Sequence, residues 1–278
     1  MTNLYDFNGL DISTSTRGQP TGDASKMPEE LFVMNKGKKT YISKEIPGFH
    51  TLSTEGRELL PYKLNMTHIN SYEGNILRNF DHEDRQIKVT YLMETDPNDP
   101  ADYRTAFSDL ESWIGMGLTQ FGFDDDPDYV YSGVLSSVDQ PTPGLNNVVS
   151  SFTFTCPKPF KKKFKSITVT FVNTQSFAKD DELLATTPVE KIDLKPSSDH
   201  VTITSSNGST IALSGVAGKH VEIRPKTKGL DLITVNNQNR PDTLDLLSDL
   251  ENFAIEPHGK ITCNDKGKVS LTYRKRGI

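Results

Sequence analysis

Residues 151–165 read SFTFTCPKPFKKKFK, and this stretch sets the fold of the first half of the chain. Phe152, Phe154 and Cys156 alternate with small polar residues. A period of two is typical of a β-strand that buries one face. The stretch therefore predicts a strand with these three side chains in a hydrophobic core.

The same stretch also predicts a domain boundary. Proline has no N–H to donate to a ladder of hydrogen bonds, so the strand should end at Pro157. The lysines that follow favour solvent. We expect a linker at about 157–165, which separates a first domain over 1–160 from a second over 165–278.

One helix is expected upstream of this strand. Asp99 suits the N-cap, and Pro100 suits the first helical position, where a missing N–H costs nothing. Gly115 and Gly117 can end the helix. The spacing predicts a helix over about 100–114 that packs one apolar stripe on a sheet: Tyr103, Ala106, Phe107, Leu110, Trp113 and Ile114.

Alternating segments predict further strands in both halves of the chain. Arg85–Met93 places four large apolar residues on one face, and Tyr129–Val138 offers Tyr129, Tyr131 and Val134 as buried residues. After residue 165, short alternating segments follow one another with turn signals between them. This arrangement predicts an antiparallel sandwich or jelly roll. The whole chain should be mainly β.

Composition and charge exclude several classes of protein. The 278 residues contain no apolar run of about 18, so we expect no membrane insertion, and the first ten residues do not resemble a secretory signal. Cys156 and Cys263 are too few for a disulfide framework.

The two halves of the chain differ in charge. Residues 1–160 carry 13 Lys and Arg against 23 Asp and Glu, a net charge of −10, and the remaining residues carry +4. Such an acidic half should repel nucleic acid.

No motif in the chain predicts catalysis, a cofactor or a metal. Asp124, Asp125 and Asp126 lack the alternating spacing of a calcium loop and suggest a solvated hairpin tip. The segment 215–220 lacks the hydroxyl residue of a phosphate-binding loop. The six histidines lack metal-ligand spacing, and no nucleophile-elbow motif is present. We therefore expect a binding or structural protein and no enzyme, with no catalytic, cofactor-binding or metal-binding residues.

The order and spacing of several segments resemble the distal tail proteins of siphophages, the bacteriophages with long, non-contractile tails. The resemblance covers almost the whole chain and rests on these segments: Leu4–Gly9, Arg85–Tyr91, Leu110–Trp113, Leu118–Tyr131, Phe152–Phe160, Val235–Arg240 and Leu271–Arg276. It implies an N-terminal β-sandwich with one α-helix, which forms a ring, followed by a galectin-like β-sandwich or jelly-roll domain.

The resemblance also implies a function. Six copies would form a homo-hexameric ring at the virion tail tip, assembled in the host cytoplasm. The ring would join the tail tube protein to the tail-associated lysin or fibre protein, and the galectin-like domain can anchor a receptor-binding protein. DNA would pass through the bore without specific binding, and the acidic first half agrees with that expectation.

Closing a ring requires two different surfaces that fit each other. We expect Leu4, Tyr5 and Phe7 to add a strand to a neighbouring sheet. Ile76, Leu77 and Phe80, within a stretch that reads as a protruding hairpin or loop, are the second candidate subunit interface. For both segments, packing within the subunit is the alternative.

A different class of function stays open. The second half could be a carbohydrate-binding module or an accessory protein of host-wall recognition. Sugar sites usually present an exposed aromatic platform, and the only tryptophan, Trp113, lies in the first half. A wall hydrolase would need a carboxylate pair or a metal set in a pocket, and the sequence shows neither.

Overall fold

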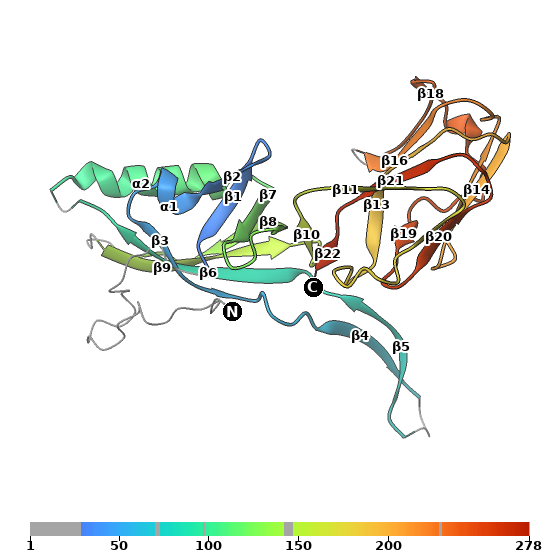
Figure 1. The fold of residues 1–278 in the computed structure, drawn as a ribbon. Helices are drawn as coiled ribbons and strands as arrows, with labels where there is room; N and C mark the ends of the chain where they lie inside the picture. Colours follow the sequence, from blue (N-terminus) through green and yellow to red (C-terminus); the bar gives the residue numbers. More distant parts are fainter. Residues whose placement is uncertain (1–28, 70–72, 97, 142–146, 228–229, 278) are drawn as a thin grey trace. The chain divides into compact units, whose positions relative to one another are not determined.

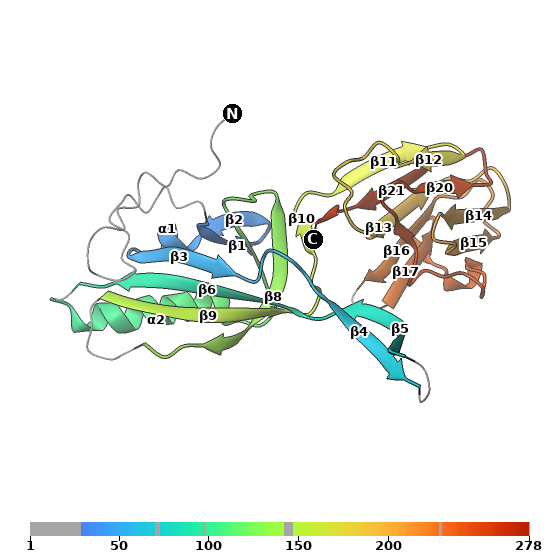
Figure 2. The ribbon, with the colours of Figure 1, turned by 90° about the horizontal axis from the view of Figure 1, so that it is seen from below.

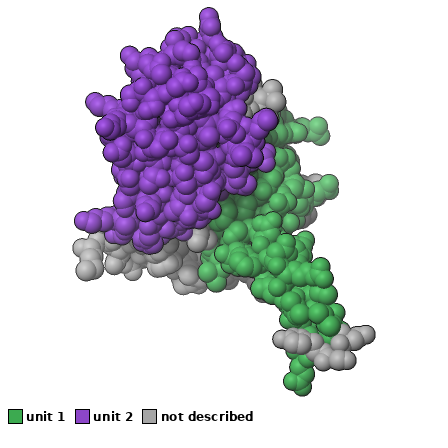
Figure 3. Space-filling view, turned by 90° about the vertical axis from the view of Figure 1, so that its right-hand side faces the viewer, with its two compact units in different colours: residues 1–161 green, residues 162–278 purple. Residues whose placement is uncertain are grey.

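The computed structural model describes residues 29–69, 73–96, 98–141, 147–227 and 230–277. The chain forms two compact units, Met1–Lys161 and Lys162–Ile278, which Figure 3 colours separately. No helix among these described residues is long and apolar enough to cross a membrane. Each unit is built mainly from antiparallel strands, so the mainly β fold class is confirmed.

Unit 1, residues 1–161, contains two antiparallel sheets that share a strand (Figure 1). Hydrogen-bonded neighbours follow the strand order β2-β1-β7-β8-β9-β6-β3 through these two sheets, and β4 and β5 form a separate pair. The elements are β1 (Leu31–Asn35), β2 (Lys38–Tyr41), α1 (Ile42–Glu45), β3 (Phe49–Glu55), β4 (Tyr62–His68), β5 (Asn75–His82), β6 (Arg85–Glu94), α2 (Pro100–Ile114), β7 (Thr119–Phe123), β8 (Tyr129–Val138) and β9 (Asn147–Cys156).

Strand β8 passes from one sheet to the other and makes the corner of the sandwich. Its first half pairs with β7 up to Gly133, and its second half pairs with β9 from Val134 onward. A Cβ on Gly133 would lie 2.9 Å from the Sγ of Cys156, so only glycine fits where the two sheets meet. The expected burial of Val134 is wrong, because beyond the corner its side chain lies on the exposed face.

The core of unit 1 follows the alternation read from the sequence. Phe152, Phe154 and Cys156 are all buried, and Phe154 stacks on Phe121 with 4.1 Å between ring centroids. The four apolar residues predicted on the β6 face are also buried in this cluster: Ile87, Val89, Tyr91 and Met93. The aromatic stack joins the two sheets, since Phe121 comes from β7 and Phe154 from β9.

Helix α2 lies along the sheet in Figure 1, and its apolar stripe packs on this core. Ala106, Leu110 and Ile114 are buried, and Phe107 and Trp113 pack against the cluster from its border. The helix begins and ends where the sequence predicts. One difference is the additional single-turn helix α1, which places Ile42 in the same core.

The cap of α2 gives a first testable prediction. The Asp99 carboxylate accepts a hydrogen bond from the N–H of Ala101 at 2.9 Å, which satisfies one of the free donors of the first turn. Asp99→Ala should lower the free energy of unfolding of unit 1 by about 1 kcal/mol. Chemical denaturation followed by circular dichroism measures this change. An unaltered midpoint in Asp99→Ala would show that the cap contributes nothing.

Unit 2, residues 162–278, is a sandwich of two sheets. One sheet has the order β11-β21-β13-β16-β17-β18, with β19 on β13, and the other has the order β12-β20-β14-β15. The bounds are β10 (Lys161–Lys163, at the boundary), β11 (Ile167–Phe171), β12 (Thr174–Ser176), β13 (Thr187–Leu194), β14 (His200–Ser205), β15 (Thr210–Ser214), β16 (Val221–Thr227), β17 (Leu230–Val235), β18 (Gln238–Asn239), η3 (Pro241–Thr243), β19 (Ala254–Ile255), β20 (Lys260–Cys263), β21 (Val269–Tyr273) and β22 (Arg276–Gly277).

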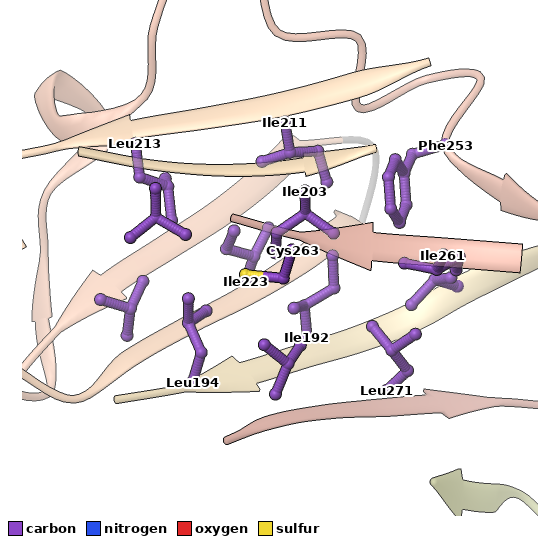
Figure 4. Packing of buried hydrophobic residues seen from close by; sticks show 14 of the residues in the cluster. Ile192, Leu194, Ile203, Ile211, Leu213, Ile223, Phe253, Ile261, Cys263 and Leu271 are labelled. Atoms are coloured by element: carbon purple, nitrogen blue, oxygen red, sulfur yellow. The ribbon is translucent and has the colours of Figure 1, made fainter. Parts of the chain in front are cut away.

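Apolar side chains from both sheets fill the space between them (Figure 4). Ile203 and Cys263 come from one sheet, and Ile192 and Leu271 come from the other. The sandwich predicted for the second half is thereby confirmed. Part of the segment expected to be a linker, about 157–165, instead forms the short strand β10.

Candidate interaction surface

Strands β4 and β5 form a two-stranded hairpin, called the arm from here on, defined by Tyr62–His68 and Asn75–His82. Figures 1 and 2 both show the arm extending beyond the sandwich of unit 1. Among the described residues, β4 and β5 pair only with each other. A two-stranded hairpin alone is marginally stable in water, so the arm needs support from elsewhere.

One face of the arm is apolar and exposed. Leu64 lies opposite Phe80 and Met66 lies opposite Leu77, and directly opposed residues share a face. Tyr62 extends the same face and meets the ring of Phe80 edge-on at 5.0 Å. These five side chains are between 50 and 58 % exposed. Contiguous exposed apolar patches of this kind are typical of interaction sites, so this face is the candidate interaction surface.

The other face of the arm is polar, and a bulge separates the two halves. Lys63 lies opposite Asp81, and Asn65 lies opposite Asn79. The register then shifts, so that Arg78 is an extra residue between Asn79 and Leu77. Arg78 is exposed and forms no ion pair with any residue that the structure describes.

The arm contains the second interface predicted from the sequence, with one change. Leu77 and Phe80 lie together on the apolar face, whereas Ile76 pairs with Thr67 on the opposite face. Sequence reasoning missed Tyr62, Leu64 and Met66, although their period of two in YKLNM was a readable signal. The residues of the first predicted interface, Leu4, Tyr5 and Phe7, lie outside the described residues.

The base of the arm is fixed by Arg85, the first residue of β6. Its buried guanidinium donates to three backbone carbonyls: Nε to Pro159 at 2.9 Å, and Nη1 to Gly56 at 3.2 Å and to Arg57 at 2.7 Å. These contacts join the segment before β4, the start of β6 and the end of unit 1. A planar fork of donors is well suited to such a junction.

Aromatic rings extend this joint into the arm. The ring of His82 stacks on Tyr62 at 4.3 Å, and Phe160 meets His82 edge-on at 4.9 Å. Both contacts lie at the end of the arm next to Arg85. The arm is therefore held at its base, while its apolar face is exposed in the part of the chain that the structure describes.

A partly buried ion pair supports the same joint from the other side. Arg57 binds both carboxylate oxygens of Asp125, at 2.6 and 2.7 Å, and lies over the ring of Phe123. Burial by itself would lower the pKa of Arg57, but the hydrogen bonds and charge of Asp125 outweigh it and raise the pKa. Arg57 therefore stays charged, and the pair ties the β7–β8 turn to the segment that leads into the arm.

The acidic run at 124–126 is thus not the solvated tip expected from the sequence. Asp126 pairs with Lys161 at 2.7 Å, and Asp124 accepts a hydrogen bond from the Tyr41 hydroxyl at 2.7 Å. Burial raises the pKa of Tyr41 to about 12, and the hydrogen bond to Asp124 and the charge of that carboxylate act in the same direction. The run fixes the turn by contacts to cations and a hydroxyl, and no group of His, Cys, Asp and Glu among the described residues is arranged to hold a metal ion.

Unit 2 presents a smaller apolar surface of its own. Leu246 is 101 % exposed and Leu247 is 90 % exposed. Their loop is nevertheless fixed, because the N–H of Asp245 donates to the carbonyl of Ala212 and Ser248 Oγ accepts from the N–H of Ala212. The loop covers the free edge of β15 and displays two leucines to solvent.

The aromatic residues of unit 2 do not form a sugar-binding platform. Phe171, Phe177, Phe253 and Tyr273 are buried in the core, and Phe164 is half-buried. These five are all the aromatic residues of this unit. A site that stacks a saccharide on an exposed ring is therefore not available in unit 2.

The fold of this chain is similar to that of a solved phage protein. No protein-family model and no curated protein sequence matches the chain. Among solved structures, the Dit protein of phage SPP1 matches with a TM-score of 0.69 at 14 % identity, over 88 % of this chain and 98 % of that one. That structure is described as a paradigm of the hub adsorption apparatus in phages that infect Gram-positive bacteria.

A chain of the phage P2 baseplate, in its activated conformation with calcium, aligns over 88 % of this chain at 9 % identity with a TM-score of 0.46. The SPP1 match covers both units. The resemblance to distal tail proteins read from the sequence is thereby confirmed at the level of the fold.

Proposed function

We propose that this chain is a structural hub of a bacteriophage tail tip, in which six copies form a closed ring. The observation that carries the proposal is the shared two-unit fold with SPP1 Dit, which covers 98 % of that protein. In this role the ring joins the tail tube to a tail-associated fibre or lysin. The chain acts by binding and positioning, without catalysis.

The arm supplies the kind of contact that a ring requires. Its apolar face is exposed among the described residues, and its partner surface is proposed to lie on another molecule. A contact between two different surfaces is head-to-tail, and repeated head-to-tail contacts close into a ring when the rotation allows. The residues proposed for the interface are Tyr62, Leu64, Met66, Leu77 and Phe80.

The charge of the first half suits a bore that passes DNA. Six copies of a segment with a net charge of −10 surround the opening with negative charge. Lys and Arg contacts to phosphates provide most of the affinity of non-specific DNA binding, and an acidic ring disfavours them. DNA would therefore pass without being held, and no specific nucleic-acid binding is expected.

Unit 2 is proposed to anchor further tail-tip proteins, among them a receptor-binding protein. Among the described residues of unit 2, Leu246 and Leu247 are the most exposed apolar side chains, and a fixed loop presents them. The carbohydrate-binding alternative is not supported, because four of the five aromatic residues of this unit lie in its core and the fifth, Phe164, is half-buried. Electron microscopy of the purified protein tests the ring: closed six-fold particles with an open centre are expected, and isolated two-unit particles at all concentrations would reject it.

The arm provides a variant for the assembly contact. Leu64→Ser with Phe80→Ser should leave unit 1 folded, because substitutions of exposed residues usually change stability by about 0.5 kcal/mol or less. The same double change should abolish association, since it removes the centre of the apolar face. Sedimentation velocity measures the loss.

The matched control is Asn65→Ser with Asn79→Ser, on the opposite face of the same hairpin. This control should sediment like the unaltered protein. If the apolar double variant still forms the full assembly, the arm is not the subunit contact.

A further inference from the structure

A cavity of about 630 Å³ lies where the C-terminal end of α2 meets β1 and β7. Trp113 and Met116 line it from the end of the helix, Leu118 lines it from the start of β7, and Val33 and Met34 line it from β1. Met116 is 82 % exposed and Leu118 is 66 % exposed. The size is that of an ordinary binding pocket, and methionine adapts readily to different apolar partners.

The helix beside this pocket is electronegative. Asp109 lies on the helix face of Ser112 and Trp113, which line the pocket, because residues three and four apart share a face. The last turn of α2 has no basic residue, and the C-terminal end of a helix carries a partial negative charge. Asp109 forms no ion pair with a described residue. The pocket therefore suits an apolar surface that carries a cation.

The arm has this combination. Its five exposed apolar side chains form one face, and the bulge inserts Arg78 directly beside Leu77 on that strand. Arg78, like Asp109, is an exposed charge without an ion pair in the described part of the chain. Apolar area and charge thus match between the arm and the pocket.

The arm of the same molecule does not occupy its own pocket. Arg85 and the Arg57–Asp125 pair fix the base of the arm. Figures 1 and 2 show the arm and α2 on different sides of the unit 1 sandwich, with the arm directed away from the helix. A contact between them has to join two molecules.

We propose that the pocket at the end of α2 receives the arm of a second copy of this chain. The apolar face of the arm covers Trp113, Met116 and Leu118, and Arg78 pairs with Asp109 of the receiving copy. Trp113 is the aromatic anchor, in keeping with the weight of tryptophan and arginine at the centre of interfaces. This assignment rests on the proposed ring, and it names the surface on which the ring closes.

The single tryptophan makes the contact directly measurable. Trp113 is the only tryptophan in the chain, so tryptophan emission excited selectively at long wavelength reports on this pocket alone. Association at rising protein concentration should shift its emission to shorter wavelength as the arm excludes water. Assembly without any change in Trp113 emission would overturn the pocket assignment while leaving the ring intact.

Charge reversal tests the pairing of the two surfaces. Arg78→Glu and Asp109→Arg, each alone, should raise the dissociation constant of the assembly about tenfold or more. The combination should restore association, because the reversed charges again oppose each other. Lys268→Glu, the same charge change at an exposed residue of unit 2, is the control and should associate normally.

The two proposals fail in different ways. Single variants that assemble like the unaltered protein, or a double variant that stays as weak as the singles, would overturn the contact between Arg78 and Asp109. An unaltered protein that never associates would instead reject the ring, and with it this contact. In the arm variant Leu64→Ser with Phe80→Ser, the emission wavelength of Trp113 should stay that of the unassociated chain at every protein concentration.

Discussion

Arg85→Ala is expected to lower the free energy of unfolding of unit 1 by about 3 kcal/mol. The change leaves three carbonyl groups, of Gly56, Arg57 and Pro159, without the donor that they share. A buried polar group that loses its partner costs about 1–3 kcal/mol, and these carbonyls, which belong to one exposed and two half-buried residues, will regain part of that cost from water. The arm should also lose its fixed direction, so assembly should weaken in the same variant.

Denaturation followed by circular dichroism, together with sedimentation, measures both effects. Arg85→Lys keeps the charge but loses the planar fork, so it should recover only part of the stability. Arg78→Ala is the matched control, because Arg78 is exposed and should leave unit 1 within about 0.5 kcal/mol of its original stability. Equal stability of Arg85→Ala and the unaltered protein would show that the joint does not hold the arm.

The second large effect is expected at Asp265 in unit 2. Its buried carboxylate accepts hydrogen bonds from the backbone N–H groups of Ser197 at 3.0 Å, Ser198 at 2.8 Å and Gly267 at 2.6 Å. It thereby joins the loop after β13 to the turn before β21. Asp265→Ala leaves these donors unpaired and should lower the free energy of unfolding of unit 2 by about 2–3 kcal/mol.

Low pH should weaken the hydrogen-bond network of Asp265 and thereby lower the stability of unit 2. Burial alone would raise the pKa of Asp265, but the hydrogen bonds from Ser197, Ser198 and Gly267 outweigh it and hold the pKa well below its usual range. A carboxyl group whose pKa is lower in the folded chain stabilises fully above the unfolded pKa of about 4 and less as the pH falls. Hydrogen bonds from Lys163 and Lys275 lower the pKa of Glu182 to about 2, which acts in the same direction.

Unit 2 should therefore lose stability as the pH falls from about 4 toward 2, and Asp265→Ala should lose less over the same interval. Urea denaturation at a series of pH values measures the difference. Asp199→Ala, an exposed carboxylate near the same loop, is the control and should keep the dependence of the unaltered protein. Parallel pH profiles for Asp265→Ala and the unaltered protein would contradict the role of Asp265.

Local patterns in the sequence were enough to predict the core of each unit. Phe152, Phe154 and Cys156 are buried as their alternation indicates, and α2 begins after Asp99 as the cap predicts. Both signals arise within a few residues of chain. They depend on backbone geometry alone and need no knowledge of distant partners.

Strand β13 was not predicted, although it lies at the centre of its sheet. A bulge between Val189 and Lys191 interrupts the alternation, and Pro188 lies near its start. Val134 was misplaced for a related reason, since the strand changes sheets at Gly133. Bulges and corners are set by the packing of several strands, which a short segment does not reveal.

The candidate interface was predicted only in part. Leu77 and Phe80 were found because they are apolar in a polar stretch, but the bulge at Arg78 sends Ile76 to the other face. The partners of Asp124, Asp125 and Asp126 are Tyr41, Arg57 and Lys161, which are far away in the sequence. The sequence alone predicts that a run of like charges is solvated, because the residues that pair with it come close only in the folded chain.

Static light scattering during gel filtration of the unaltered protein measures whether six copies associate. We expect one species with about six times the 31.0 kDa mass of the chain, which dissociates in the Leu64→Ser, Phe80→Ser variant. A single species of 31.0 kDa at every concentration would contradict the ring and the contacts derived for it.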